Sequence, residues 1–115
     1  MNIKSKSIHA VTGADDGIRI CIMRRVKPEY DFNIWLPELS PSDELLEDYN
    51  TGRIDWDGYV PRFTAEVLDN PTRTKYFEIV RDIAKKYPIT LLCHEDTDEK
   101  CHRRLVIEKI ATLEK

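Results

Sequence analysis

A short apolar run near the C-terminal end most constrains what this chain can fold into. Ile89 to Cys93 (ITLLC) follows a proline and is apolar throughout, apart from one threonine. Such a run is typical of a strand that is buried on both faces in the middle of a sheet. Helical patterns lie on either side of it, over residues 72–86 and from about residue 99 to the end. A helix, a central strand and a helix in succession predict an α/β domain.

One domain is expected over residues 1–115, because this length buries a core and is short for two domains. The expected architecture is a mixed, partly parallel sheet of three or four strands covered by helices. Charged residues make up 34% of the chain, which indicates a charge-rich surface.

The N-terminal third predicts two strands. Residues 3–11 alternate loosely between polar and apolar side chains, whereas Ile18 to Val26 alternates clearly and is rich in β-branched residues. Residues 12–17 between them contain two glycines and two aspartates, a composition typical of a turn. Two strands joined this closely favour an antiparallel hairpin. Residues 27–39 then form an irregular loop with one extended piece.

Two helices are predicted after this loop. The first begins with Ser40 as its cap and Pro41 at its first position, and it ends at residues 50–52. The second covers residues 57–68, with Pro61 near its first turn.

The two helices that flank the central strand come next. Asn70 is the expected cap of the helix over residues 72–86. The last helix is expected to begin at Asp96 or Asp98, with Glu99 as a capping-box partner. The side chains expected to face the core are Tyr76, Ile79, Val80 and Ile83 in the former helix and Leu105, Val106, Ile110 and Leu113 in the latter.

Composition and charge exclude several classes of protein. The net charge of −3 gives no general reason to expect nucleic-acid binding. No apolar run approaches the 18 residues of a membrane span, and the N-terminal residues lack the pattern of a signal peptide. Three cysteines without an export signal indicate a cytoplasmic protein with free thiols. The sequence identifies no cofactor and no oligomeric state.

The strongest chemical signal is a cluster of cysteines and histidines. Two of the three cysteines and two of the three histidines fall within residues 93–102. Cys93 is expected at the carboxyl end of the central strand, and Cys101 and His102 at the start of the last helix. Ligands of open α/β sheets bind outside the carboxyl ends of the strands, so a polar pocket is expected there.

One interpretation of this cluster is a pocket for a small anionic ligand with thiol chemistry. Helix N-termini favour anions and lower the pKa of thiols. Cys93 or Cys101 would be the nucleophile, a histidine the base and an arginine the anion clamp. The candidate catalytic residues are Cys93, Cys101 and His102, and the candidate ligand-binding residues are Arg24, His94, Glu95 and Arg103.

Two other interpretations stay open. The ligand types of the cluster suit zinc or iron. However, its spacing is not that of a C-x2-C knuckle, and adjacent Cys101 and His102 on a helix would point about 100° apart. No metal ligand is therefore assigned. Alternatively, the cysteines are buried filler in a non-enzymatic binding or regulatory module. That module would present an exposed aromatic surface at Tyr30, Phe32 and Trp35.

Several spaced motifs resemble the DUF488 family. The C-terminal pattern is Leu91-Leu92-Cys93-His94-Glu95 followed by Cys101-His102-Arg103-Arg104. The middle segment, WLPELSPS over residues 35–42, and the aromatic positions 56, 59 and 63 resemble the YeaO-like branch, as does Arg24 at a strand end. After Arg24 the branch's Trp-Pro-Arg-Gly turn is replaced by residues 26–29 and shortened. The resemblance implies a compact α/β domain and no established activity.

Overall fold

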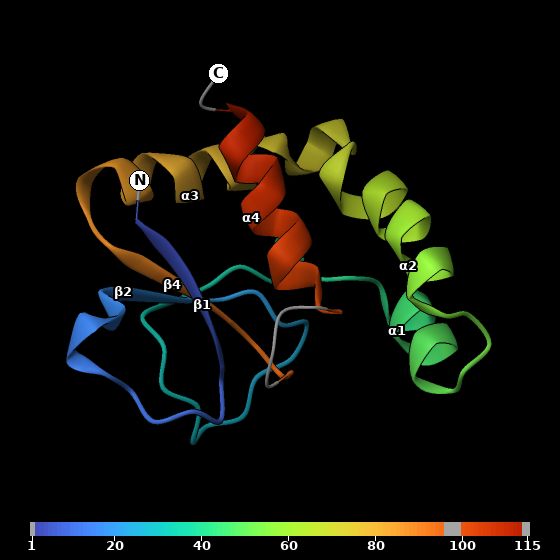
Figure 1. The fold of residues 1–115 in the computed structure, drawn as a ribbon, viewed down its shortest axis with the longest axis horizontal. Coiled ribbons are helices and arrows are strands. Elements are labelled where there is room, and N and C mark those ends of the chain that lie inside the picture. The colour runs from blue at the N-terminus through green and yellow to red at the C-terminus, as the bar shows by residue number, and fades with distance from the viewer. Residues whose placement is uncertain (1, 96–99, 114–115) are drawn as a thin grey trace.

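The computed structural model describes residues 2–95 and 100–113 and forms one α/β globule (Figure 1). The expected fold class is confirmed. Its strands are β1 (Ile3–Ser7), β2 (Ile18–Cys21), β3 (Ile34–Trp35) and β4 (Ile89–Cys93). Its α-helices are α1 (Asp43–Asn50), α2 (Trp56–Phe63), α3 (Thr74–Lys86) and α4 (His102–Leu113). The shorter helical segments are η1 (Ala14–Asp16), η2 (Pro37–Leu39), η3 (Thr64–Leu68) and η4 (Pro71–Arg73).

The four strands form one sheet in the order β1-β4-β2-β3, and each neighbouring pair is parallel. β4 has the bounds predicted from the sequence, and all five of its residues are buried. It occupies an inner position because its side chains are apolar on both faces, whereas β1 carries lysines and serines.

The predicted antiparallel hairpin is wrong. β4 lies between β1 and β2 and pairs with both, so the two N-terminal strands do not touch as neighbours. The segment between them is also longer than expected, because β1 ends at Ser7. It returns along the sheet through η1, and the Thr90 hydroxyl of β4 donates a 2.7 Å hydrogen bond to the Asp16 carbonyl. The two strands therefore run in the same direction.

All four α-helices contribute to one hydrophobic core, which the inward faces of β2 and β4 complete. Figure 1 shows α3 and α4 over the sheet and α1 and α2 to one side. Representative fully buried residues are Ile20 of β2, Leu45 of α1, Phe63 of α2, Phe77 of α3 and Val106 of α4.

The helix boundaries differ from the predictions in their details. Ser42, not Ser40, caps α1, because its hydroxyl accepts a 3.1 Å hydrogen bond from the Leu45 amide. Asp55 caps α2, which continues into the π-helical segment η3, and Pro61 lies inside that helix rather than in its first turn.

Asn70 caps the segment leading into α3, as predicted, by accepting a hydrogen bond from the Thr72 amide. Ile79 is 43% exposed, and Phe77 is the buried residue of that turn instead. The expected caps Asp96 and Asp98, with Glu99, lie outside the described residues.

Among the residues that the structure describes, no helix combines the length and the apolar character that a membrane crossing requires.

Candidate functional site

A cavity of about 270 Å³ lies at the carboxyl ends of β4 and β2. Six of the seven residues that the sequence singles out line this cavity: Arg24, Cys93, His94, Glu95, Cys101 and His102. The seventh, Arg103, lies behind Cys93. Because the sheet is parallel, its strands end on the same edge, and residues far apart in the chain meet there.

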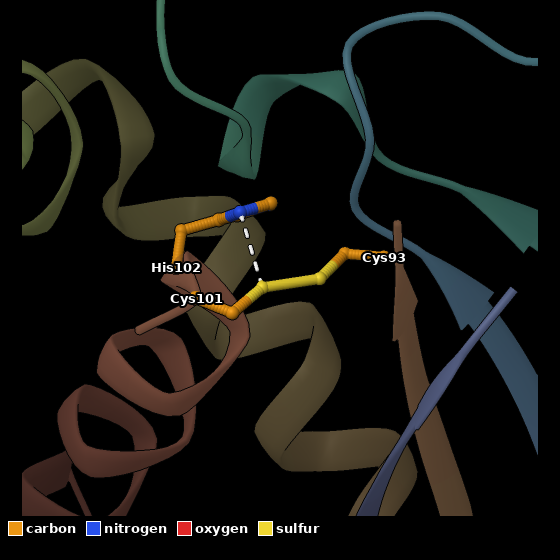
Figure 2. A group of neighbouring side chains, drawn as sticks. All are labelled: Cys93, Cys101 and His102. Carbon is orange, nitrogen blue, oxygen red and sulfur yellow. Dashed lines mark hydrogen bonds between the residues drawn. A yellow bond between two sulfur atoms is a disulfide. The ribbon is translucent and has the colours of Figure 1, made fainter. Parts of the chain in front are cut away.

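Cys93 faces the start of α4 because of the strand's two-residue period. Ile89, Leu91 and Cys93 lie on one face of β4, and the first two are in the core beneath the helices. There Cys93 forms a disulfide with Cys101, as Figure 2 shows. The expectation of free thiols is therefore wrong for these two cysteines. Sequence spacing misses this pairing because it does not show that Cys101, just before α4, lies beside the end of β4.

Cys21 stays a free thiol and does not belong to the site. It pairs with Leu92 in the β2–β4 register, so it lies on the opposite sheet face from Cys93. It is fully buried, and this burial raises the pKa of its thiol. The interpretation of Cys21 as apolar filler agrees with this environment.

His102 is the first residue of α4, and its ring is held in one orientation. Its Nε2 lies 2.7 Å from the Ile22 carbonyl oxygen, which accepts only, so Nε2 carries the proton. The other ring nitrogen, Nδ1, lies 3.8 Å from the Cys101 sulfur (Figure 2). Burial lowers the pKa of His102 to about 4, so the ring is neutral at pH 7.

Arg103 is 1% exposed and holds the strand end from behind. Its Nη1 donates to the carbonyl oxygens of Glu95, at 2.7 Å, and Lys6, at 3.2 Å, and it lies 3.3 Å from the Cys93 sulfur. A guanidinium at this distance stabilises a thiolate on Cys93 whenever the disulfide is reduced.

Two arginines stand at the end of β2, and both line the cavity. Arg25 forms a bidentate ion pair with Asp43, at 2.6 and 2.9 Å, and the Arg24 Nε lies 3.2 Å from the same carboxylate. The guanidinium of Arg25 therefore holds the pKa of Asp43 below its usual value. One carboxylate shared by two arginines leaves one positive charge on this wall. Arg25 is not among the predicted site residues, because a pair of arginines at a strand end is more often simply solvated.

His94 and Glu95 lie at the exposed side of the cavity. The His94 Nδ1 is 2.9 Å from Nε2 of His9, whose ring also packs edge-on against Tyr30. No sequence pattern points to His9, because it belongs to the segment after β1 and meets His94 only in the parallel sheet.

If the cluster only fills the core of a binding or regulatory module, both of its thiols and both of its imidazoles should be buried. Cys93, Cys101 and His102 are buried, whereas His94 is exposed. Among the three aromatic residues expected at the surface, Trp35 is 42% exposed, and the other two are half-buried. The burial pattern therefore meets that requirement only in part.

The geometric objection to a metal site does not hold in the folded chain. Cys101 precedes the first helical residue, so helix geometry does not force its side chain away from that of His102. The sulfurs of Cys93 and Cys101 and a ring nitrogen of His102 all lie within 4.8 Å of one another.

Comparison with known proteins supports the resemblance. A family model, DUF488-N3a, described as the active DUF488-N3 subclade, matches residues 3–113. The chain is also similar to the uncharacterised protein YeaO of Escherichia coli strain K12, with 26% identity over 118 residues. That alignment covers 98% of this chain and all of the relative. No solved structure matches the chain.

Proposed function

The chain belongs to the DUF488-N3a family, and we propose that it binds a small anionic disulfide in the cavity and reduces it by thiol–disulfide exchange. One observation carries this proposal: a cysteine pair and two arginine side chains line the same cavity. The description of the family model as an active subclade agrees with chemistry at this site.

The arginines favour an anionic ligand. Arg24 and Arg25 share the single carboxylate of Asp43, so their guanidinium groups retain a net positive charge. Planar guanidinium groups recognise carboxylates through paired hydrogen bonds. Glu95, at the exposed side, would accept hydrogen bonds from an ammonium or hydroxyl group of the same ligand.

Cys93 is the proposed nucleophile and Cys101 the resolving thiol. Arg103 lies beside the Cys93 sulfur and favours its thiolate. In the reduced protein, the neutral His102 would accept a hydrogen bond from the Cys101 thiol through Nδ1, which lies 3.8 Å from that sulfur. This assignment changes the role expected of a histidine, since a ring with a pKa of about 4 is a weak base at pH 7.

The proposed step starts from the reduced protein. The Cys93 thiolate attacks one sulfur of the ligand, the ligand's disulfide breaks, and one thiolate leaves. That leaving thiolate takes the proton of Cys101. The Cys101 sulfur then attacks the mixed disulfide at Cys93 and releases the second thiolate. The ligand gains two electrons, and the protein ends with the Cys93–Cys101 disulfide that the structure contains.

The test compares how fast the reduced protein reduces two disulfide substrates, and thiol release is the measurement. Dithiodiglycolate carries a carboxylate at each end, whereas 2-hydroxyethyl disulfide is neutral. We expect faster reduction of the anionic substrate. Arg24→Gln should slow that reaction by about tenfold, the effect of losing one charge-assisted hydrogen bond, and should leave the neutral substrate nearly unchanged.

Lys27→Gln is the matched control, because Lys27 is an exposed cation near the same strand end and does not line the cavity. Cys101→Ser should release one thiol per chain and stop at the mixed disulfide, whereas Cys93→Ser should release none. Equal rates for the two substrates in the wild-type protein would refute the anion pocket. Release of both thiols by Cys101→Ser would refute the exchange mechanism.

A further inference from the structure

We propose that the reduced form of this site is a metal centre. In that form, the sulfurs of Cys93 and Cys101 and Nδ1 of His102 bind one Zn²⁺-like ion, with a fourth position open to the cavity. This inference uses the cysteine pair but does not depend on disulfide exchange or on an anionic ligand.

The donor atoms are close to the spacing that such an ion requires. The three atoms lie within 4.8 Å of one another, and the Cys101 sulfur is 3.8 Å from Nδ1 of His102. Tetrahedral zinc with ordinary bond lengths places a sulfur and a nitrogen ligand about 3.5 Å apart. Side-chain adjustments of a few tenths of an ångström therefore complete this part of the site.

The backbone of the two cysteines also suits an ion between their sulfurs. Their Cα atoms are 7.9 Å apart. Bridged cysteines usually have Cα atoms about 4.4–6.8 Å apart. The wider separation leaves room for the two sulfurs to move apart onto a common ion without a shift of β4 or α4.

His102 has the tautomer that a metal ligand needs. Its Nε2 donates to the Ile22 carbonyl, so Nδ1 presents a lone pair toward the sulfurs. Histidines that bind metals usually donate their other N–H to a carbonyl or carboxylate, which fixes the ring. Here that second contact is already made by the backbone of the chain segment after β2.

The surroundings of the sulfurs favour the deprotonated form that metal binding requires. Arg103 reaches the Cys93 sulfur from behind, at 3.3 Å, and can donate to it while the ion binds from the front. Both cysteines are shielded from solvent, at 1% and 4% exposure, which by itself disfavours a thiolate, so Arg103 and the bound cation supply the stabilisation.

The fourth position opens to the cavity, because all three donor residues line it. Two thiolates and one imidazole with a solvent-filled fourth position are typical of a reactive zinc site rather than a closed structural one. The donor set favours zinc over magnesium or calcium, which prefer oxygen ligands.

The two states of the cysteines exclude each other. A dithiol reductant supplies two electrons and two protons to the disulfide and is itself oxidised to a disulfide. A divalent ion then displaces the two thiol protons. Oxidation releases the ion, so metal occupancy reports the redox state of the pair.

The test titrates phosphine-reduced, chelator-treated protein with Co²⁺ under anaerobic conditions. We expect one ion per chain, with a thiolate-to-cobalt charge-transfer band and the ligand-field bands of tetrahedral cobalt. Zn²⁺ should displace it, and azide should shift the bands by occupying the fourth position. His102→Gln should weaken binding by more than about tenfold, because glutamine keeps a donor for the Ile22 carbonyl but lacks the imidazole nitrogen.

The matched controls are His94→Gln and Cys21→Ala, which should bind cobalt like the wild type. Arg24→Gln should also bind cobalt normally, although it reduces the anionic substrate more slowly, and this separates the inference from the proposed function. The absence of a charge-transfer band in the reduced wild-type protein would overturn the inference. An unchanged band in the double variant Cys93→Ser/Cys101→Ser would do the same.

Discussion

Asp16 is a buried carboxylate in η1, beside the start of β2. Lys6 donates to it from β1 at 2.9 Å, Arg19 donates from β2 at 2.5 Å, and the Gly13 amide contributes a further bond. Burial alone would raise the pKa of Asp16, but the bonds to Lys6, Gly13 and Arg19 outweigh it and hold the pKa below the ordinary value of 3.8. The charged form is therefore favoured in the folded protein.

Asp16→Asn should lower the free energy of unfolding by about 3 kcal/mol at pH 7, because it leaves buried Arg19 without its carboxylate. The folded-state pKa lies below the unfolded value, so the stabilisation is complete above pH 3.8 and is lost as the pH falls through the folded pKa. Urea unfolding at pH 7 and pH 3 measures both effects, and the difference between variant and wild type should shrink at pH 3. Asp43→Asn, at an exposed carboxylate, is the control and should change stability little. A difference that is as large at pH 3 as at pH 7 would contradict this account.

At the scale of elements, the junction between η1 and β2 depends on Gly17. Its φ is +65°, and a Cβ there would lie 2.0 Å from the Pro88 carbonyl oxygen, which also accepts the Ile18 amide at 3.0 Å. The position therefore needs glycine both for its backbone conformation and for the close approach of β4.

Gly17→Ala should lower the free energy of unfolding by about 2 kcal/mol or more beyond the loss in Gly52→Ala. Both variants place alanine in a left-handed conformation, so this difference measures the steric clash at residue 17. Gly52 is the matched control because its φ is +79° but a Cβ there meets nothing within 4 Å. Urea unfolding of both variants measures the difference. If both variants lost the same free energy of unfolding, the close approach of the chain at residue 17 would not explain why glycine is needed there.

At the scale of the whole molecule, the Cys93–Cys101 disulfide joins the end of the central strand to the residue that precedes the last helix. The bond closes a loop with a sequence separation of 8. For a loop of this size, the chain-entropy model predicts a stabilisation of about 2–3 kcal/mol. Reduction in the presence of a chelator should lower the unfolding free energy by this amount.

Thermal and urea unfolding with and without a phosphine reductant measure this effect. Cys21→Ala keeps the disulfide and should respond to reductant like the wild type. The double variant Cys93→Ser/Cys101→Ser should not respond. A response in that variant would mean that the reductant acts elsewhere in the chain.

Local patterns in the sequence predicted where the elements begin better than where they end, since β1 ends at Ser7 and β2 at Cys21 rather than at residues 11 and 26. The apolar run at residues 89–93 gave the bounds of β4, and the proline and asparagine at 70–71 gave the start of the helical segment before α3. The predicted cap of α1 lies two residues before the observed one, because Ser40 and Ser42 are both suitable caps. The tertiary contact of Ser42 with Glu66, at 2.8 Å, favours the second.

The order and direction of the strands could not be predicted from local sequence patterns. Two strands close in the chain suggest a hairpin, but burying the apolar side chains of β4 on both faces stabilises the fold more than a short connection does. β4 therefore takes the place between β1 and β2 and makes the sheet parallel. This choice depends on the whole core, which no local window contains.

The sequence by itself determined the α/β class, the central strand and most of the polar residues that line the cavity, because these follow from periodicity and residue type. The tertiary structure decided the parallel strand order, the disulfide, the approach of Arg25 and His9, and the direction of each ring nitrogen of His102. These features depend on contacts between residues far apart in the chain. Such contacts form only when the core is packed, since each requires a specific placement of one element against another.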